Sequence, residues 1–139
     1  MALSASREVV EQEGKLTAMP VAAGAKIFKG ALVKVNAAGF LVPASVEAGS
    51  NFAGIAYEDC DNTGLAAGAL ECRVIRVGTF LLTIVGATQA NVGDTVYASA
   101  DDLVTVTSAA NLQKVGVIDR FVSATQVWVT IQSMSGLGV

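Results

Sequence analysis

Apolar and polar side chains alternate with a period of two along most of the chain, and the spacing of an amphipathic helix is almost absent. Short alternating runs are separated by turns that carry glycine, proline, asparagine or aspartate. The pattern predicts strands at residues 15–19, 31–36, 40–44, 52–58, 72–77, 79–85, 95–98, 103–107, 114–121 and 126–132. Short strands at regular spacing are typical of a sandwich or a small barrel. We therefore predict a mostly β fold, a single compact β-barrel or β-sandwich.

The order of turns and strands recurs along the chain, which suggests two pseudo-repeated halves. GALV at residues 30–33 aligns with GDTV at 93–96, FL at 40–41 with LV at 103–104, AGI at 53–55 with VGV at 115–117, and residues 72–77 with 126–131. Chance agreement among valine-rich strands is the alternative, and both interpretations stay open at this point. A true repeat would mean that neither half buries its apolar face alone.

The chain is expected to divide into an extended N-terminal arm at residues 1–14, a β domain at residues 15–132 and a flexible tail at residues 133–139. The arm combines four charged residues with one apolar pair, Val9–Val10, so it cannot fold alone. One brief helical turn is expected at residues 108–113, with Ser108 as its N-cap.

Composition narrows the class of function. Of 139 residues, 53% are hydrophobic and 15% are charged, which excludes disorder over most of the length. A formal net charge of −3 argues against a direct nucleic-acid partner, which needs a cationic face. The chain contains no histidine, so every mechanism that uses imidazole as a base or metal ligand is excluded. A surface this poor in charge favours association with copies of itself or with a partner.

Neither an export signal nor a membrane span is expected. The first 14 residues lack an apolar stretch, and the longest uncharged runs, 77–93 and 121–139, are interrupted by polar residues. Synthesis in a reducing cytosol favours free, partly buried thiols at Cys60 and Cys72, with a disulfide as the alternative. A catalytic cysteine is disfavoured because no histidine can activate it.

Three further sequence features have both a functional and a structural interpretation. Residues 58–64, EDCDNTG, resemble a calcium loop, but Thr63 and Leu70 stand where the loop needs ligands, so a solvated turn is the better interpretation. The basic stretch of Lys26, Lys29 and Lys34 is interpreted as a solvated strand face, with contact to an acidic partner as the alternative. Trp128 alternates with its valine neighbours and is expected in the core, with an exposed interface anchor as the alternative. No metal, cofactor or catalytic site is predicted.

Several turn-and-strand phrases are similar to those of small head-decoration, or cement, proteins of tailed bacteriophages. The phrases are AAGAKIFKGALVKVN, GIAYEDCDNTG and VGDTVYAS, and the resemblance covers residues 1–132. It implies a non-enzymatic virion protein, made in the host cytoplasm, that binds the outer surface of an icosahedral head. It also implies homotrimers that clamp neighbouring subunits of the phage major capsid protein against the pressure of internal DNA.

The N-terminal arm is the expected capsid-binding segment. An extended arm offers unpaired backbone groups that can add a strand to the sheet edge of a partner. The residues expected to bind are Arg7, Glu8, Val9, Val10 and Glu11. The alternative for the arm is a loose end without a role, and the alternatives for the protein are a tail or baseplate β module or a carbohydrate-binding β domain.

Overall fold

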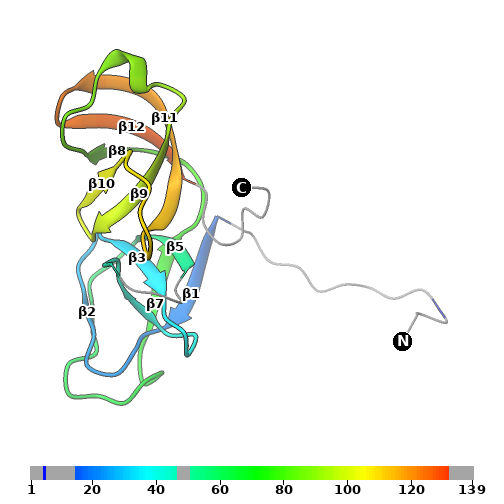
Figure 1. Cartoon of the computed structure of the whole chain (residues 1–139). Coiled ribbons are helices and arrows are strands. Elements are labelled where there is room, and N and C mark those ends of the chain that lie inside the picture. Colours follow the sequence, from blue (N-terminus) through cyan, green and yellow to red (C-terminus); the bar gives the residue numbers. More distant parts are fainter. Residues whose placement is uncertain (1–4, 6–14, 47–50, 132–139) are drawn as a thin grey trace.

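The computed structural model describes residues 5, 15–46 and 51–131, and the statements below concern these residues (Figure 1). The predicted tail, and all five arm residues expected to bind the capsid, Arg7, Glu8, Val9, Val10 and Glu11, lie outside the described residues. Their proposed roles therefore stay predictions.

Two five-stranded antiparallel sheets pack together as a sandwich, which confirms the predicted fold class; neither sheet closes into a barrel. The first sheet has the order β1-β7-β5-β3-β4, with β1 (Leu16–Pro20), β3 (Leu32–Val35), β4 (Leu41–Pro43), β5 (Asn51–Ala56) and β7 (Glu71–Ile75). The second has the order β10-β9-β11-β12-β8, with β8 (Thr79–Thr83), β9 (Thr95–Ala100), β10 (Leu103–Thr105), β11 (Gln113–Ser123) and β12 (Gln126–Ile131). A small sheet joins β2 (Lys26–Ile27) to β6 (Cys60–Asp61).

The two sheets repeat each other strand for strand. Reversing the second order gives β8-β12-β11-β9-β10, which has the same connections as β1-β7-β5-β3-β4. Each half also has one isolated parallel bridge between its two edges, Val21 with Leu41 in the first half and Ile84 with Val104 in the second. Matching turn glycines donate matching backbone hydrogen bonds, Gly30 N to Ala56 O and Gly93 N to Ile118 O, each 2.9 Å long. The halves suggested by the sequence are therefore present in the topology.

Two glycines mark the same crowded position in each half. A Cβ atom on Gly54 would collide with the Ile75 carbonyl on β7, and one on Gly116 would collide with the Thr130 carbonyl on β12. Ile75 therefore corresponds to Thr130, and one register earlier Val74 corresponds to Val129.

This correspondence corrects the alignment of the last strand. The sequence alignment placed Cys72 on Gln126, but Cys72 pairs with Met19 as Val127 pairs with Leu82. Cys72 and Val127 are both fully buried, whereas Gln126 is exposed. Residues 72–77 and 126–131 share no identical residue in that alignment, so the sequence did not determine their relative register. The alignment was wrong by one residue here.

Apolar side chains on the inner faces form the core. Leu32, Phe52 and Ile55 of the first half join a cluster made mostly by the second half, so this cluster spans both sheets. A separate cluster in the first half includes Ile27 and Cys60 of the small sheet. Among the described residues, no helix is long and apolar enough to cross a membrane.

One local prediction was wrong, and three short elements were missed. Residues 108–113 form no helix; they make an irregular turn in which Asn111 has a φ of 70°. The short 3-10 helix lies instead at Gln89–Asn91, where Thr88 and Asn91 form a capping box. The two-residue strands β2 and β6 were missed because two residues are too short to show a period.

Candidate functional site

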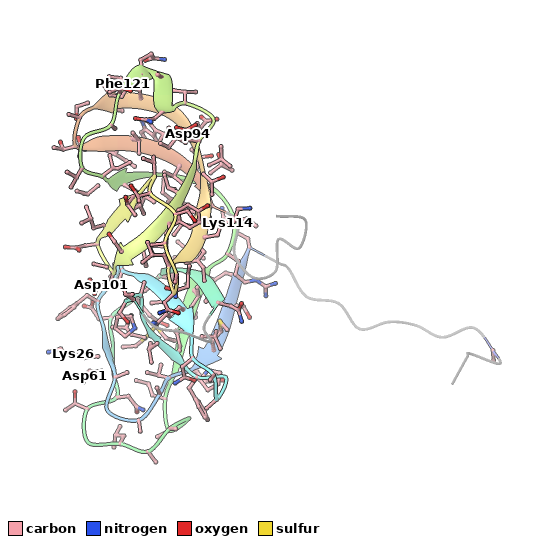
Figure 2. All side chains as sticks on the ribbon, viewed as in Figure 1. Lys26, Asp61, Asp94, Asp101, Lys114 and Phe121 are labelled. Carbon is pink, nitrogen blue, oxygen red and sulfur yellow. A yellow bond between two sulfur atoms is a disulfide. The ribbon has the colours of Figure 1, made fainter. Side chains whose placement is uncertain are left out.

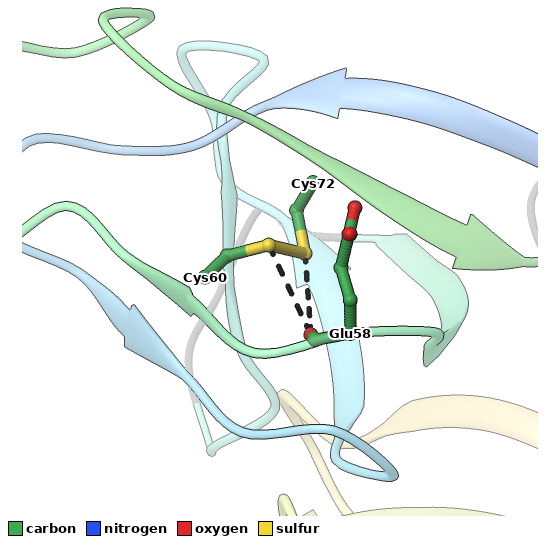
Figure 3. A group of neighbouring side chains, drawn as sticks. All are labelled: Glu58, Cys60 and Cys72. Atoms are coloured by element: carbon green, nitrogen blue, oxygen red, sulfur yellow. Dashed lines mark hydrogen bonds between the residues drawn. A yellow bond between two sulfur atoms is a disulfide. The ribbon is translucent and has the colours of Figure 1, made fainter.

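Cys60 and Cys72 form a disulfide in the structure, so the expectation of free thiols was wrong (Figure 3). Cys60 lies on β6 and Cys72 on β7, and their Cα atoms are 5.8 Å apart, within the range that a disulfide spans. Both sulfur atoms lie 3.7–3.8 Å from the carbonyl oxygen of Glu58. The disulfide closes the glycine-rich loop between the two cysteines.

The carboxylate of Glu58 binds the guanidinium of Arg73 on β7. Glu58 Oε1 lies 3.0 Å from one Arg73 terminal nitrogen, and Oε2 accepts from Arg73 Nε at 3.1 Å and from its backbone N–H at 3.1 Å. These hydrogen bonds hold the pKa of the Glu58 carboxyl below its usual range and raise the pKa of Arg73. The Arg73 guanidinium also lies 4.9 Å from the centre of the Tyr57 ring, which makes a cation–π pair.

Glu58, Cys60 and Cys72 bring ligand-type atoms within 4.8 Å of one another. This group does not fit a metal ion, because the two sulfurs are bonded to each other and the carboxylate is held by Arg73. A thiolate ligand would require that the disulfide be reduced first.

The segment that resembles a calcium loop is a turn. Asp59 Oδ1 accepts from the backbone N–H of Lys29 at 2.7 Å, and Asp61 Oδ1 accepts from that of Thr63 at 3.0 Å. Asp61, which pairs with Lys26 between β6 and β2 (Figure 2), has a lowered pKa, chiefly because of its hydrogen bond with Thr63. Asn62 is fully buried and donates to backbone carbonyls that hold the loop closed. The Oδ1 atoms of Asp59 and Asp61 are engaged by backbone N–H groups, in agreement with a structural turn.

The basic stretch is not a uniform solvated face. Lys26 and Lys29 are exposed, but Lys34 on β3 is fully buried, so the prediction for Lys34 was wrong. Its ammonium donates to the backbone oxygen and to the hydroxyl of Ser45, each at 3.0 Å. The contact fastens the chain after β4 to the buried face of β3.

Trp128 lies on the outer face of the second sheet, so the expectation of a core position was wrong. Val127 and Val129 are fully buried, while Trp128 between them is half-buried. In the register, Trp128 is flanked by Leu81 of β8 and Arg120 of β11. The Arg120 guanidinium lies 5.3 Å from the centre of the Trp128 ring.

We call Leu81, Trp128 and Arg120, with the neighbouring threonines Thr79 and Thr130, the Trp128 face. The threonine hydroxyls are 2.9 Å apart across β8 and β12, and both residues are exposed. Leu81 remains 42% exposed although it is a large apolar residue. Tryptophan and arginine are enriched at interface hot spots, so Trp128 and Arg120 are the residues of this face best suited to bind a protein partner.

A groove of about 580 Å³ lies where the two halves meet. Its lining comes from the start of β1, the residue after β5, and the chain from the end of β7 to the start of β8: Lys15, Leu16, Tyr57, Ile75, Val77, Gly78, Thr79 and Phe80. These residues include no carboxylate or thiol, so the groove suits an apolar side chain of a partner better than a reaction.

The sequence analysis missed the roles of Leu81 and Arg120. The available signal was the period of two: Leu81 and Trp128 both alternate with inward residues, which places them on outer faces. That the two lie side by side depends on the pairing of β8 with β12, which no local pattern specifies. Comparison with protein-family models, with curated proteins and with solved structures gives no match to this chain.

Proposed function

We propose that the protein is a non-enzymatic virion protein that binds the outer surface of an icosahedral phage capsid and cements neighbouring major capsid subunits. The observation that carries the proposal is the Trp128 face, an outer sheet surface where Leu81, Trp128 and Arg120 lie side by side and which a neighbour on the capsid lattice can cover. The sequence resemblance to head-decoration proteins supplies the identity of the partner. A rigid sandwich with a shared core supplies the body that a clamp needs.

The arm at residues 1–14 is proposed to reach a neighbour while the body rests on the lattice. Fixing each arm residue costs about 1–2 kcal/mol, so backbone hydrogen bonds and several side chains must act together. Many copies on one lattice compensate, because each attached contact raises the effective concentration for the next. Trimers on the capsid are part of the same proposal.

Carbohydrate binding is less well supported. A sugar stacks on a free aromatic face, whereas one face of the Trp128 ring is occupied by the Arg120 guanidinium. The Tyr57 ring carries Arg73 in the same way. One face of each of these two rings is therefore already covered by a guanidinium.

Deleting residues 2–13 tests the proposal. Capsids assembled from the major capsid protein encoded with this chain are mixed with full-length or deleted protein and sedimented. We expect the deletion to weaken attachment about tenfold or more, through lost avidity, and to leave the melting temperature of the free protein almost unchanged. Equal decoration by both proteins would show that the arm has no role, and absence of binding by the full chain would overturn the proposed function.

A further inference from the structure

The same cation–π pair occurs in both halves with its residues exchanged. Arg73 lies on β7 and its aromatic partner Tyr57 follows β5; Arg120 lies on β11 and its partner Trp128 on β12. The strand β7 corresponds to β12, and β5 corresponds to β11. The arginine of the first half therefore lies where the second half has its ring, and both pairs lie at the same place on the outer face.

Only the first pair is completed by a carboxylate. Glu58 binds the Arg73 guanidinium through both of its oxygens, which is the bidentate geometry that this planar group favours. Among the described residues, no carboxylate lies within ion-pair distance of Arg120, although Asp119 precedes it in sequence. Arg120 is exposed, and its guanidinium lies beside the Trp128 ring on the outer face of the sheet.

We propose that residues 6–14 of a second copy bind the Trp128 face, where a glutamate takes on Arg120 the place that Glu58 takes on Arg73. The proposal rests on the proposed function, which sets copies side by side on a lattice. It names residues 6–14 of a neighbouring copy as the segment that covers the Trp128 face.

The chemistry of residues 6–14 matches the face. The segment SREVVEQEG has three glutamates against one arginine, and the glutamates surround the apolar pair Val9–Val10. Bound as an extended strand, Val9 and Glu11 project from the same side, about 7 Å apart. Adjacent strands in the sheet are separated by about 4.8 Å, so Leu81, Trp128 and Arg120 form a row roughly 10 Å long. Val9 can therefore cover Leu81 and Trp128 while Glu11 meets Arg120.

The arrangement has a consequence for assembly. Each copy carries one donating segment and one receiving face, so the contact is heterologous and runs from one copy to the next. Such contacts close into a ring when the rotation between copies allows it. A closed ring leaves no face empty, in agreement with the trimers of the proposed function.

Trp128 is the single tryptophan of the chain, so the fluorescence of the full-length protein reports on this face directly. We expect the emission to change on dilution as the segment leaves the face, together with a fall in mass measured by sedimentation. Replacing Glu8, Glu11 and Glu13 by glutamine should remove both changes at the same concentrations. Arg120→Gln should weaken the association about tenfold, while Arg73→Gln, the matched control in the first half, should leave it unchanged.

Two results would overturn the inference. The first is an emission that does not depend on concentration, whether because residues 6–14 bind their own body or because they bind nothing. The second is an equal effect of Arg120→Gln and Arg73→Gln. The experiment contains no capsid, so either result leaves the proposed function to be judged by the sedimentation of decorated capsids.

Discussion

The two halves of the molecule share a topology and differ in chemistry. The first half has a disulfide, an added two-stranded sheet and an arginine neutralised by Glu58. The second half has the same five strands and the same edge bridge, with Val127 in the place of Cys72 and the tryptophan on its outer face. The shared scaffold depends on a few backbone positions such as Gly54 and Gly116, whereas the outer surfaces of the two halves differ. A surface whose chemistry differs from its repeat is where a specific partner is expected.

The largest loss of stability is expected from substitutions at Gly54 and Gly116, the two glycines at corresponding positions of the halves. Gly54→Ala or Gly116→Ala would force a methyl group against the backbone of the adjacent strand, which cannot move without breaking the sheet. We expect each to lower the free energy of unfolding by about 3 kcal/mol. Gly54 adds strain from its φ of +144°. Denaturation in guanidinium would measure both.

Gly64→Ala is the matched control for these variants. Gly64 also has a positive φ, but no atom lies within 4 Å of the position of the added Cβ. Its cost should be limited to the backbone term of about 1–2 kcal/mol. If all three variants lost the same free energy, crowding between strands would not be what the two halves have in common.

Reduction of the Cys60–Cys72 disulfide is expected to destabilise the first half and to leave the second half unchanged. The disulfide spans a sequence separation of 12, and closing a loop of that size stabilises the folded state by about 3 kcal/mol in the chain-entropy model. A reductant should therefore lower the melting temperature of the wild-type protein and leave the doubly substituted Cys60→Ala, Cys72→Ala protein unaffected. Protease cleavage should rise within residues 61–71 and stay constant in the second half. Equal cleavage in both halves would contradict a local role for the bond.

A smaller effect is expected from Glu58 at acid pH. Because its pKa is lowered in the folded state, its contribution to stability is present above the unfolded value of about 4.3 and is lost as the pH falls through the lowered value. Glu58→Gln should slightly lower the melting temperature at neutral pH, and the difference from wild type should disappear in acid. The same substitution at Glu71, an exposed glutamate at the start of β7, is the control. A difference that persisted in acid would rule out the ion pair as its cause.

The sequence was sufficient for the fold class and most strands, because alternation is local and strong in this chain. It also indicated the repeat through glycine positions such as Gly54 and Gly116, where backbone crowding leaves no other residue. The register of β12, the burial of Lys34 and the outward position of Trp128 depend on which strands become neighbours. The disulfide depends on the 5.8 Å approach of two Cα atoms, which sequence spacing alone does not establish.

Hydroxyl-radical footprinting of decorated capsids tests the central claim, that the second half provides the binding surface, most directly. The oxidation of Trp128 and of Tyr57, the rings of the two matched cation–π pairs, is compared between the free protein and the protein on the capsid. We predict that Trp128 becomes severalfold less reactive on the capsid, because a partner covers its face, while Tyr57, which is 44% exposed in the free protein, changes little. Protection of Tyr57 with Trp128 left reactive would contradict the account.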